Sequence, residues 1–478
     1  MRAVSLVAAA AALPISANSA GGQAITVGPG ADFATIAEAV RSAQPGDTVR
    51  VTAGLYRERI QVTVPLTLRG EGWPVVDGGG DGHVVEVLAP LRLEGFVIRG
   101  SGDGVEEEHA GVMVRDAPGT RIEGNRLEDV FYGVYLKNSP GSLVSRNAIT
   151  GKPFTPPRRG DGIRLWYSSG SGILENVVIG TRDVVIYFSD SLLVRGNVIE
   201  DGRYGLHYMY SNHNVFERNR FDGNEVGAFL MYSVGIRLRG NVFANAAGLT
   251  GMGIGLKDSD LIEASGNLIV GNVIGIHLDN SPHSLDSTNR FDDNLLLAND
   301  AGVRLLPSVT GNVFEHNEFV NNGSPVIVAG GSDTGQAARN LWRANYWSEY
   351  AGFDQDGDAE GDTPFVHARL ADDLIGRHPA LGLFDRSPAL GVLEVISRFF
   401  PLLKPEPVVV DEAPLVRGRL LSRWVAETNG PSSDPAARSR VAGSPRPAGP
   451  TTWQSAAWLL LALGAIGVLW RAAGRRGA

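Results

Sequence analysis

The chain has 478 residues, a formal net charge of −9 and no cysteine. The charges are spread without blocks of lysine or arginine, which argues against a nucleic-acid-binding surface. Without cysteine the protein can form no disulfide bond, and a site for a soft metal ion would have to use methionine and histidine. A chain of this length can bury a large core or build one long solenoid, and its 61 glycines indicate frequent turns.

Residues 1–24 have the features of a secretory signal peptide. Arg2 supplies the positive start, an apolar run covers residues 4–15, and small residues follow at positions 17–20. A buried N-terminal helix is the alternative, but an alanine run that opens a chain rarely begins a solenoid. Export places the protein in the periplasm or outside the cell.

The segment at residues 25–80 is predicted to form an entry module. A short strand at residues 25–27 precedes a helix at 35–43, whose apolar residues recur at helical spacing. A strand at residues 60–64 follows. Because a solenoid exposes a hydrophobic cross-section at its end, a helix at this position can cap it. The phrase PGDTVRVTAGLYRERIQV resembles the opening of pectin-lyase-like right-handed β-helices.

Between Gly111 and Gly302 the sequence repeats with a period of 22 residues. Glycines that open a Gly-aliphatic-x-aliphatic pattern alternate with asparagines that open an Asn-x-aliphatic pattern. Helical-hairpin repeats need about 34 residues, and the leucine-rich consensus is missing. The period and the many β-branched residues therefore predict an all-β, right-handed parallel β-helix over residues 25–350. The recurrent asparagines are expected to stack as an amide ladder in a turn, which is a structural role.

Outward-facing residues of the repeat form two columns along one wall. The first column reads Tyr135, Arg164, Ile186, His207, Phe229, Gly255 and His277, and the second reads Lys137, Trp166, Phe188, Met209, Met231, Lys257 and Asp279. The wall therefore exposes an apolar stripe, and a stripe of this length marks a binding surface. We predict that Trp166, Phe188, Phe229 and His277 belong to this surface.

Three coils carry insertions, at residues 151–159, 244–250 and 282–288. Insertions in a solenoid often lie on its binding face. At the level of sequence, the alternative that the loop at residues 151–159 covers the apolar stripe stays open.

After residue 350 the repeat decays, and residues 351–400 are predicted to cap the solenoid with an acidic loop and a helix at 388–400. Asp354, Asp356, Asp358 and Asp362 resemble a calcium loop, since hard cations bind several carboxylate oxygens. A solvated turn is the alternative. Residues 401–452 are rich in proline, serine and arginine and are predicted to be a disordered linker.

An apolar segment at residues 453–470 is flanked by tryptophan at both ends and is followed by a basic tail at 471–478. As a helix it would be about 27 Å long, close to the thickness of a bilayer core. Because positive residues stay cytoplasmic, the tail is expected inside and the solenoid in the periplasm. A soluble core helix is the alternative, but the segment is isolated behind the predicted linker.

Several phrases within this pattern resemble the NosD family, over about residues 25–415. They are the entry phrase, the asparagine coils, HYMYSN at residues 207–212, FLMYS at 229–233, and NYW at 345–347 with the acidic run after it. The resemblance implies a periplasmic copper-binding accessory protein for maturation of nitrous-oxide reductase, rather than an enzyme. It also implies three partners: an ABC transporter with an ATPase and a membrane subunit, a copper chaperone, and the reductase. The predicted transmembrane helix is additional to the soluble form associated with this family.

His207, Met209 and Met231 are the candidate copper ligands. The two methionines hold equivalent positions on neighbouring coils, so their Cα atoms are expected about 4.8 Å apart. His207 lies two residues before Met209 and therefore on the same face. Thioether and imidazole groups suit the soft cuprous ion. Docking of a protein partner stays open as the alternative, because methionine and aromatic residues serve it equally well.

A polysaccharide lyase or hydrolase of the β-helix type is the competing function, and a non-catalytic carbohydrate- or protein-binding scaffold is a third. Such an enzyme needs clustered carboxylates or an activated arginine on one outward wall. The predicted wall carries Asp258 and Asp279 on adjacent coils without an obvious third partner. This pattern favours the copper-related role.

Overall fold

The computed structural model describes residues 22–248, 251–331, 339–384, 387–400 and 405–429. The predicted signal peptide falls outside these residues except for its last three positions, and the predicted transmembrane helix and basic tail fall wholly outside them. Among the described helices, none is both long and apolar enough to cross a membrane. The chain divides into two compact units, Met1–Ser422 and Arg423–Ala478, and the solenoid belongs to the first.

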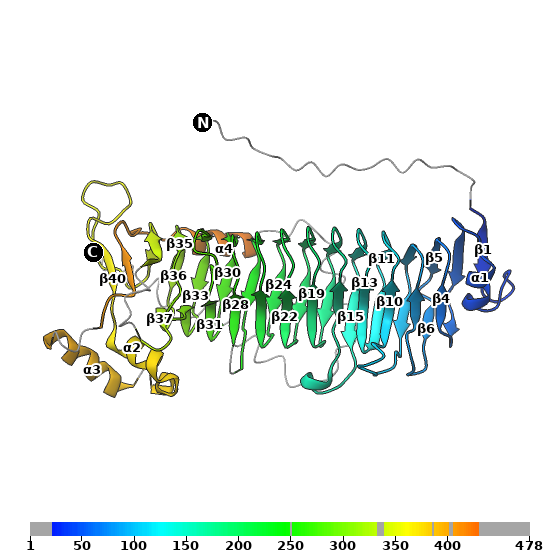
Figure 1. Cartoon of the computed structure of the whole chain (residues 1–478), viewed down its shortest axis with the longest axis horizontal. Helices are drawn as coiled ribbons and strands as arrows, with labels where there is room; N and C mark the ends of the chain where they lie inside the picture. Colours follow the sequence, from blue (N-terminus) through cyan, green and yellow to red (C-terminus); the bar gives the residue numbers. More distant parts are fainter. Residues whose placement is uncertain (1–21, 249–250, 332–338, 385–386, 401–404, 430–478) are drawn as a thin grey trace. The chain divides into compact units, whose positions relative to one another are not determined.

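A typical coil contributes one short strand to each of three sheets, and the strands of successive coils pair in parallel (Figure 1), apart from the antiparallel pair of β40 with β41. The sheets contain 16, 12 and 13 strands. Tyr204 pairs with Val226 and Met209 pairs with Met231, a spacing of one repeat. The fold is therefore a parallel β-helix of about 13 coils, which confirms the all-β parallel solenoid predicted from the period.

The strands of each sheet are short and follow one another along the axis of the solenoid. The 12-stranded sheet consists of β4 (Ile60–Val62), β7 (Val85–Val87), β10 (Ala110–Arg115), β13 (Tyr132–Lys137), β16 (Ile163–Trp166), β19 (Asp183–Tyr187), β22 (Tyr204–Met209), β25 (Val226–Met231), β28 (Met252–Lys257), β31 (Ile274–Asp279), β34 (Ala301–Leu305) and β37 (Ser324–Val328). The 13-stranded sheet consists of β3 (Leu55–Tyr56), β6 (Val75–Asp77), β9 (Val97–Arg99), β12 (Arg126–Val130), β15 (Ala148–Gly151), β18 (Val177–Ile179), β21 (Val198–Glu200), β24 (Arg220–Asp222), β27 (Val242–Ala244), β30 (Leu268–Val270), β33 (Leu295–Leu297), β36 (Glu318–Val320) and β39 (Tyr346–Trp347). The 16-stranded sheet consists of β1 (Ala24–Val27), β2 (Thr48–Thr52), β5 (Leu66–Glu71), β8 (Leu91–Glu94), β11 (Arg121–Glu123), β14 (Leu143–Ser145), β17 (Gly172–Leu174), β20 (Leu193–Arg195), β23 (Val215–Glu217), β26 (Arg237–Arg239), β29 (Glu263–Ser265), β32 (Asn289–Asp292), β35 (Asn312–Glu315), β38 (Leu341–Arg343), β41 (Val409–Asp411) and β40 (Phe365–His367).

A helix closes the N-terminal end of the solenoid (Figure 1). This helix, α1 (Ile36–Ser42), begins at Thr35, whose hydroxyl accepts a hydrogen bond from the Glu38 backbone N–H at 3.3 Å. It buries Ile36, Ala39 and Val40, which confirms the predicted capping helix. The 3₁₀ helix η1 (Pro156–Arg158) lies within the first insertion, and the remaining helices follow the last coils in sequence: α2 (Leu370–Arg377), the 3₁₀ helix η3 (Pro379–Phe384), α3 (Pro388–Phe399) and α4 (Leu420–Asn429).

The core is the stack of inward side chains predicted from the alternation. Inward pairs such as Ile254 and Leu256 are fully buried and contact their equivalents on neighbouring coils. The asparagines form the predicted ladder. Asn147 Oδ1 accepts a hydrogen bond from Asn125 Nδ2 at 3.2 Å, and Asn147 Nδ2 donates to Asn176 Oδ1 at 3.0 Å. The same contact recurs through Asn197, Asn219, Asn241, Asn267, Asn294, Asn317 and Asn345.

The prediction of a disordered linker over residues 401–452 is wrong for part of its length. Within that range β41 pairs in parallel with β38 and antiparallel with β40. Asp411 is fully buried, and its carboxylate accepts hydrogen bonds from Asn345 Nδ2 at 3.1 Å and from Trp347 Nε1 at 3.0 Å. Within the part of the chain that the structure describes, no further coil supplies an acceptor for Asn345, and a carboxylate 66 residues away ends the ladder. Such a distant contact leaves no local pattern in the sequence.

Candidate metal site

The outward face of β19, β22 and β25 carries the candidate residues. The insertion at residues 151–159 and the one that begins at residue 244 both follow a strand of the 13-stranded sheet and precede a strand of the 12-stranded sheet, and these three strands lie between the two insertions along the chain. In this strip Met209 pairs with Met231, and His207 pairs with Phe229. The predicted alignment of the two methionines and of His207 beside Met209 is therefore confirmed.

The predicted position of Phe188 is wrong by one residue. Tyr187 pairs with Trp166 on one side and with Met209 on the other, so Tyr187 occupies the column assigned to Phe188. Val185 likewise replaces Ile186, which faces the core. Asp183, and not Val184, holds the position that glycine holds in other coils, because Ile163 pairs with Val184 and Trp166 with Tyr187.

A ladder of serine residues carries the signal that would have set this register. Ser168, Ser189 and Ser211 follow the second outward column by two residues, and the hydroxyl of each accepts a backbone hydrogen bond from the preceding coil. Counting back from Ser189 identifies Tyr187 and not Phe188.

Phe188 belongs instead to a stack of aromatic rings along the neighbouring turn. Its ring lies 4.9 Å from Tyr167 and 5.3 Å from Tyr210, and Tyr210 lies 5.0 Å from Tyr232, all with nearly parallel planes. Tyr167 and Tyr210 are exposed, at 53% and 45%. The ring faces contact one another, so this stack presents ring edges to solvent. It borders the methionine column, and none of its tyrosines was predicted.

The side chain of His207 is held in place by hydrogen bonds. Its Nδ1 lies 3.2 Å from Asp183 Oδ2, and the Tyr187 hydroxyl lies 3.0 Å from its Nε2 and 3.2 Å from its Nδ1. The Tyr204 ring stacks against the imidazole at 4.8 Å. Metal-ligating histidines typically donate one ring N–H to a carboxylate, which orients the other nitrogen toward the metal. Asp183 is placed to give His207 this orientation.

Asp183 belongs to a buried group of charges. Its carboxylate pairs with Arg203, and Tyr204 N–H donates to it at 3.1 Å. Burial by itself raises the pKa of Asp183, but hydrogen bonds from His207 and Arg203 outweigh burial and lower that pKa below its usual value. Asp161 lies just before β16, on the preceding coil, and burial and the charge of Asp183 raise the pKa of Asp161 to about 6. The sequence pattern did not reveal this group, because its members come from separate coils.

The loop at residues 151–159 covers part of the wall. Phe154 and Trp166 pack against a small apolar cluster that includes Met113, Tyr132 and Tyr135. This cluster lies on β10 and β13, on the N-terminal side of the methionines. The alternative in which the loop covers the stripe therefore holds for Tyr135 and in part for Trp166. Among the ligand candidates, Met231 is 8% exposed, and Met209 and His207 are partly exposed.

His277, predicted as part of the surface, lies on β31. It is 9% exposed, and its Nδ1 is buried without a hydrogen-bond partner among the described residues. Burial and the nearby charge of Arg304 lower the pKa of His277 to about 4. The ring is therefore neutral at physiological pH, the form in which imidazole binds a metal ion.

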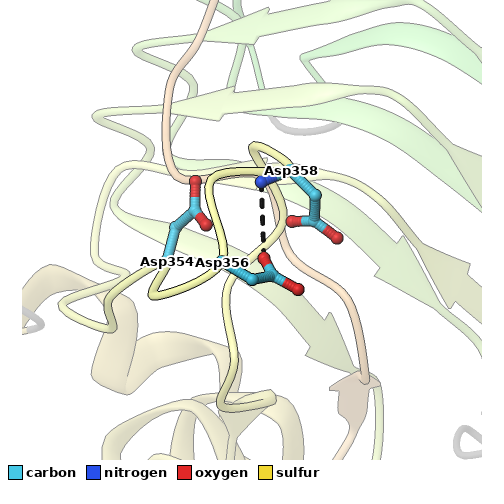
Figure 2. A group of neighbouring side chains, drawn as sticks. All are labelled: Asp354, Asp356 and Asp358. Atoms are coloured by element: carbon cyan, nitrogen blue, oxygen red, sulfur yellow. Dashed lines mark hydrogen bonds between the residues drawn. The ribbon is translucent and has the colours of Figure 1, made fainter.

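The acidic loop brings three of its four predicted residues together (Figure 2). Ligand oxygens of Asp354, Asp356 and Asp358 lie within 4.8 Å of one another. Asp362 is outside this group, and its carboxylate accepts a hydrogen bond from the Gln355 N–H at 2.6 Å. Backbone N–H groups also bind the loop carboxylates, as in the 3.3 Å contact from Asp358 N–H to Asp356. A solvated turn makes the same contacts.

The amino-acid sequence is similar to one protein family and to two named proteins. Residues 145–352 match the family described as "Periplasmic copper-binding protein (NosD)". A protein of Pseudomonas aeruginosa named "Probable ABC transporter binding protein NosD" is 29% identical over 416 residues, 77% of this chain and 87% of the relative. The chain is of the NosD type. A protein of the same name from Stutzerimonas stutzeri is 30% identical to the NosD-type chain over 129 residues, 27% of this chain and 29% of the relative.

Several solved structures resemble the NosD-type chain at low identity. A mannuronic-acid-specific polysaccharide family 6 lyase from the human gut microbiota is 16% identical, covers 70% of this chain and 89% of its own, and has a TM-score of 0.45. The catalytic domain of a GH87 α-1,3-glucanase is 13% identical, covers 69% of each chain, and has a TM-score of 0.43. Likeness at this level carries no argument about activity.

Proposed function

We propose that this protein is a periplasmic accessory protein that binds copper on the outward wall of the 12-stranded sheet and passes it on. The NosD-type sequence supports a periplasmic, copper-related role. The wall supports it through its donor set: Met209 and Met231 are in register on adjacent strands, and His207 lies on the same face as Met209. Two thioethers and an imidazole suit Cu(I).

The observation that carries the proposal is the way His207 is held. Asp183 lies within hydrogen-bond distance of Nδ1, and Tyr187 is the contact of Nε2. When the Tyr187 hydroxyl moves away, Nε2 is the free nitrogen and lies on the same face as the two thioethers. A carboxylate that orients a metal-binding histidine in this way strengthens the site.

Cu(I) titration against a competing chelator tests the ligand set. The triple variant His207→Ala, Met209→Leu and Met231→Leu should lose one Cu(I) site, because the leucines keep the volume but not the sulfur. Met113→Leu is the matched control, since Met113 is fully buried in another cluster on the same sheet. If the triple variant keeps the affinity and stoichiometry of the wild type while partner binding falls, the wall is a docking surface instead.

The buried charges are the observation that would favour a carbohydrate-active enzyme. Asp161 and Asp183 are each at most 3% exposed, and they pair with Arg164 and Arg203. A sugar cannot reach carboxylates buried in this way, so we assign the group to support of His207. Turnover of a uronate polymer by the wild type that is lost in Asp183→Asn would reverse this assignment.

The partners follow from the same proposal. We propose that the protein works with an ABC transporter, a copper chaperone and nitrous-oxide reductase, and that residues 453–470 anchor it in the cytoplasmic membrane. The names of the relatives support the transporter association. Pull-down of the exported protein with membrane partners, with and without copper, tests it. Absence of the transporter subunits from the captured material under both conditions would contradict it.

A further inference from the structure

Soft ligands continue along the wall beyond Met231. The next residue after Phe229 in the first column is Gly255 on β28, and the absence of a side chain there leaves space on the sheet surface. The Phe229 ring and the Met252 thioether fill this space. A Cβ atom added at Gly255 would lie 2.3 Å from Phe229 Cδ2 and 3.2 Å from Met252 Sδ. The sulfur of Met252 is therefore drawn over the wall on the coil that follows Met231.

His277 borders the same position from the other side. It is the direct pairing partner of Gly255 on β31. Its ring contacts the backbone of Arg304, and its Nδ1 is buried without a hydrogen-bond partner among the described residues. An unpaired buried nitrogen is costly unless a ligand uses it. The Met252 thioether thus lies close to the outward side of Gly255, and an imidazole with an unpaired nitrogen stands on the strand paired with that glycine.

We propose that Met252 and His277, which lie one and two coils beyond Met231, form a second Cu(I) site. The inference rests on the proposed function and extends it, because copper could then move along the column from His207 and the two methionines to Met252 and His277. Sulfur and imidazole nitrogen are the donors that the cuprous ion prefers. The next residue in the column after His277 is Arg304, which is not a soft ligand. The soft ligands therefore end at His277.

The test uses the full-length protein and Cu(I) alone, titrated against a competing chelator. The double variant Met252→Leu and His277→Gln should bind one Cu(I) fewer than the wild type, with Met113→Leu again as the control. Met252→Leu by itself should weaken Cu(I) binding at the second site at least tenfold. Because Met252 is partly exposed, this variant tests the inference even if the substitution of the buried His277 impairs folding. X-ray absorption of the copper-loaded triple variant of the first site should show sulfur and imidazole nitrogen around the remaining copper.

The outcomes separate this inference from the proposed function. Unchanged copper stoichiometry and affinity in both the double variant and Met252→Leu would overturn the second site, and loss of copper from the triple variant would still support the first. Loss of copper only from the double variant would support Met252 and His277 and reject the first ligand set. A wild-type protein that binds no Cu(I) would overturn both.

Discussion

The carboxylate of Asp411 should hold the last coil of the solenoid closed. It accepts hydrogen bonds from Ala344 N–H at 3.1 Å, Asn345 N–H at 3.0 Å, Asn345 Nδ2 at 3.1 Å and Trp347 Nε1 at 3.0 Å. Asp411→Ala leaves these four donors buried without an acceptor, at roughly 1–3 kcal/mol for each donor. We therefore expect the local free energy of unfolding to fall by about 4 kcal/mol or more.

Native-state hydrogen exchange measures this effect directly. Since about 1.4 kcal/mol corresponds to a factor of ten, the amides of Ala344 and Asn345 should exchange roughly a thousandfold faster in Asp411→Ala. Asp411→Asn keeps the shape and one acceptor oxygen, so its effect should be smaller. Amides near Asn219 are the internal control, because each coil contacts only its neighbours. Exchange of Ala344 and Asn345 within about threefold of the wild type would refute the assignment.

The contacts of Asp411 also change the expected result of a truncation. The sequence pattern, in which no repeat lies beyond Pro401, predicts that a chain ending there keeps a folded solenoid. That truncation removes Asp411 together with Val408 and Val409, which are buried. It should expose the same amides as Asp411→Ala, whereas truncation after residue 429 should leave them protected.

Three further predictions concern charge and metal. Because the pKa of Asp161 is raised to about 6, the folded state binds its proton more tightly than the unfolded state. The free energy of unfolding should fall by a few kcal/mol as the pH rises from about 4 through about 6, and Asp161→Asn should flatten this slope. Calcium should raise the melting temperature of the wild type but not of Asp356→Asn. An unchanged melting temperature of the wild type would show that the acidic loop is a solvated turn. Tyr187→Phe should tighten Cu(I) binding several-fold at unchanged stoichiometry, because Nε2 of His207 then does not have to give up the hydrogen bond from Tyr187 before it binds the metal. Weaker binding in this variant would indicate that Tyr187 is itself a ligand.

The repeat by itself determined the architecture. A 22-residue period with alternating aliphatic residues sets which side chains face the core, and one asparagine per coil sets the amide ladder. These features follow from local geometry that every coil repeats. For the same reason the alignment of Met209 with Met231 could be predicted from residue spacing alone.

Only the tertiary structure decided the features that depend on the stacking of particular coils. Asp183 holds the glycine position of its coil, so Tyr187 rather than Phe188 stands beside Met209. The approach of Asp183 to His207 joins residues 24 apart, and that of Asp411 to Asn345 joins residues 66 apart. Neither contact repeats along the chain, so no periodic signal exists from which it could be predicted. Such contacts exist only once the coils are stacked.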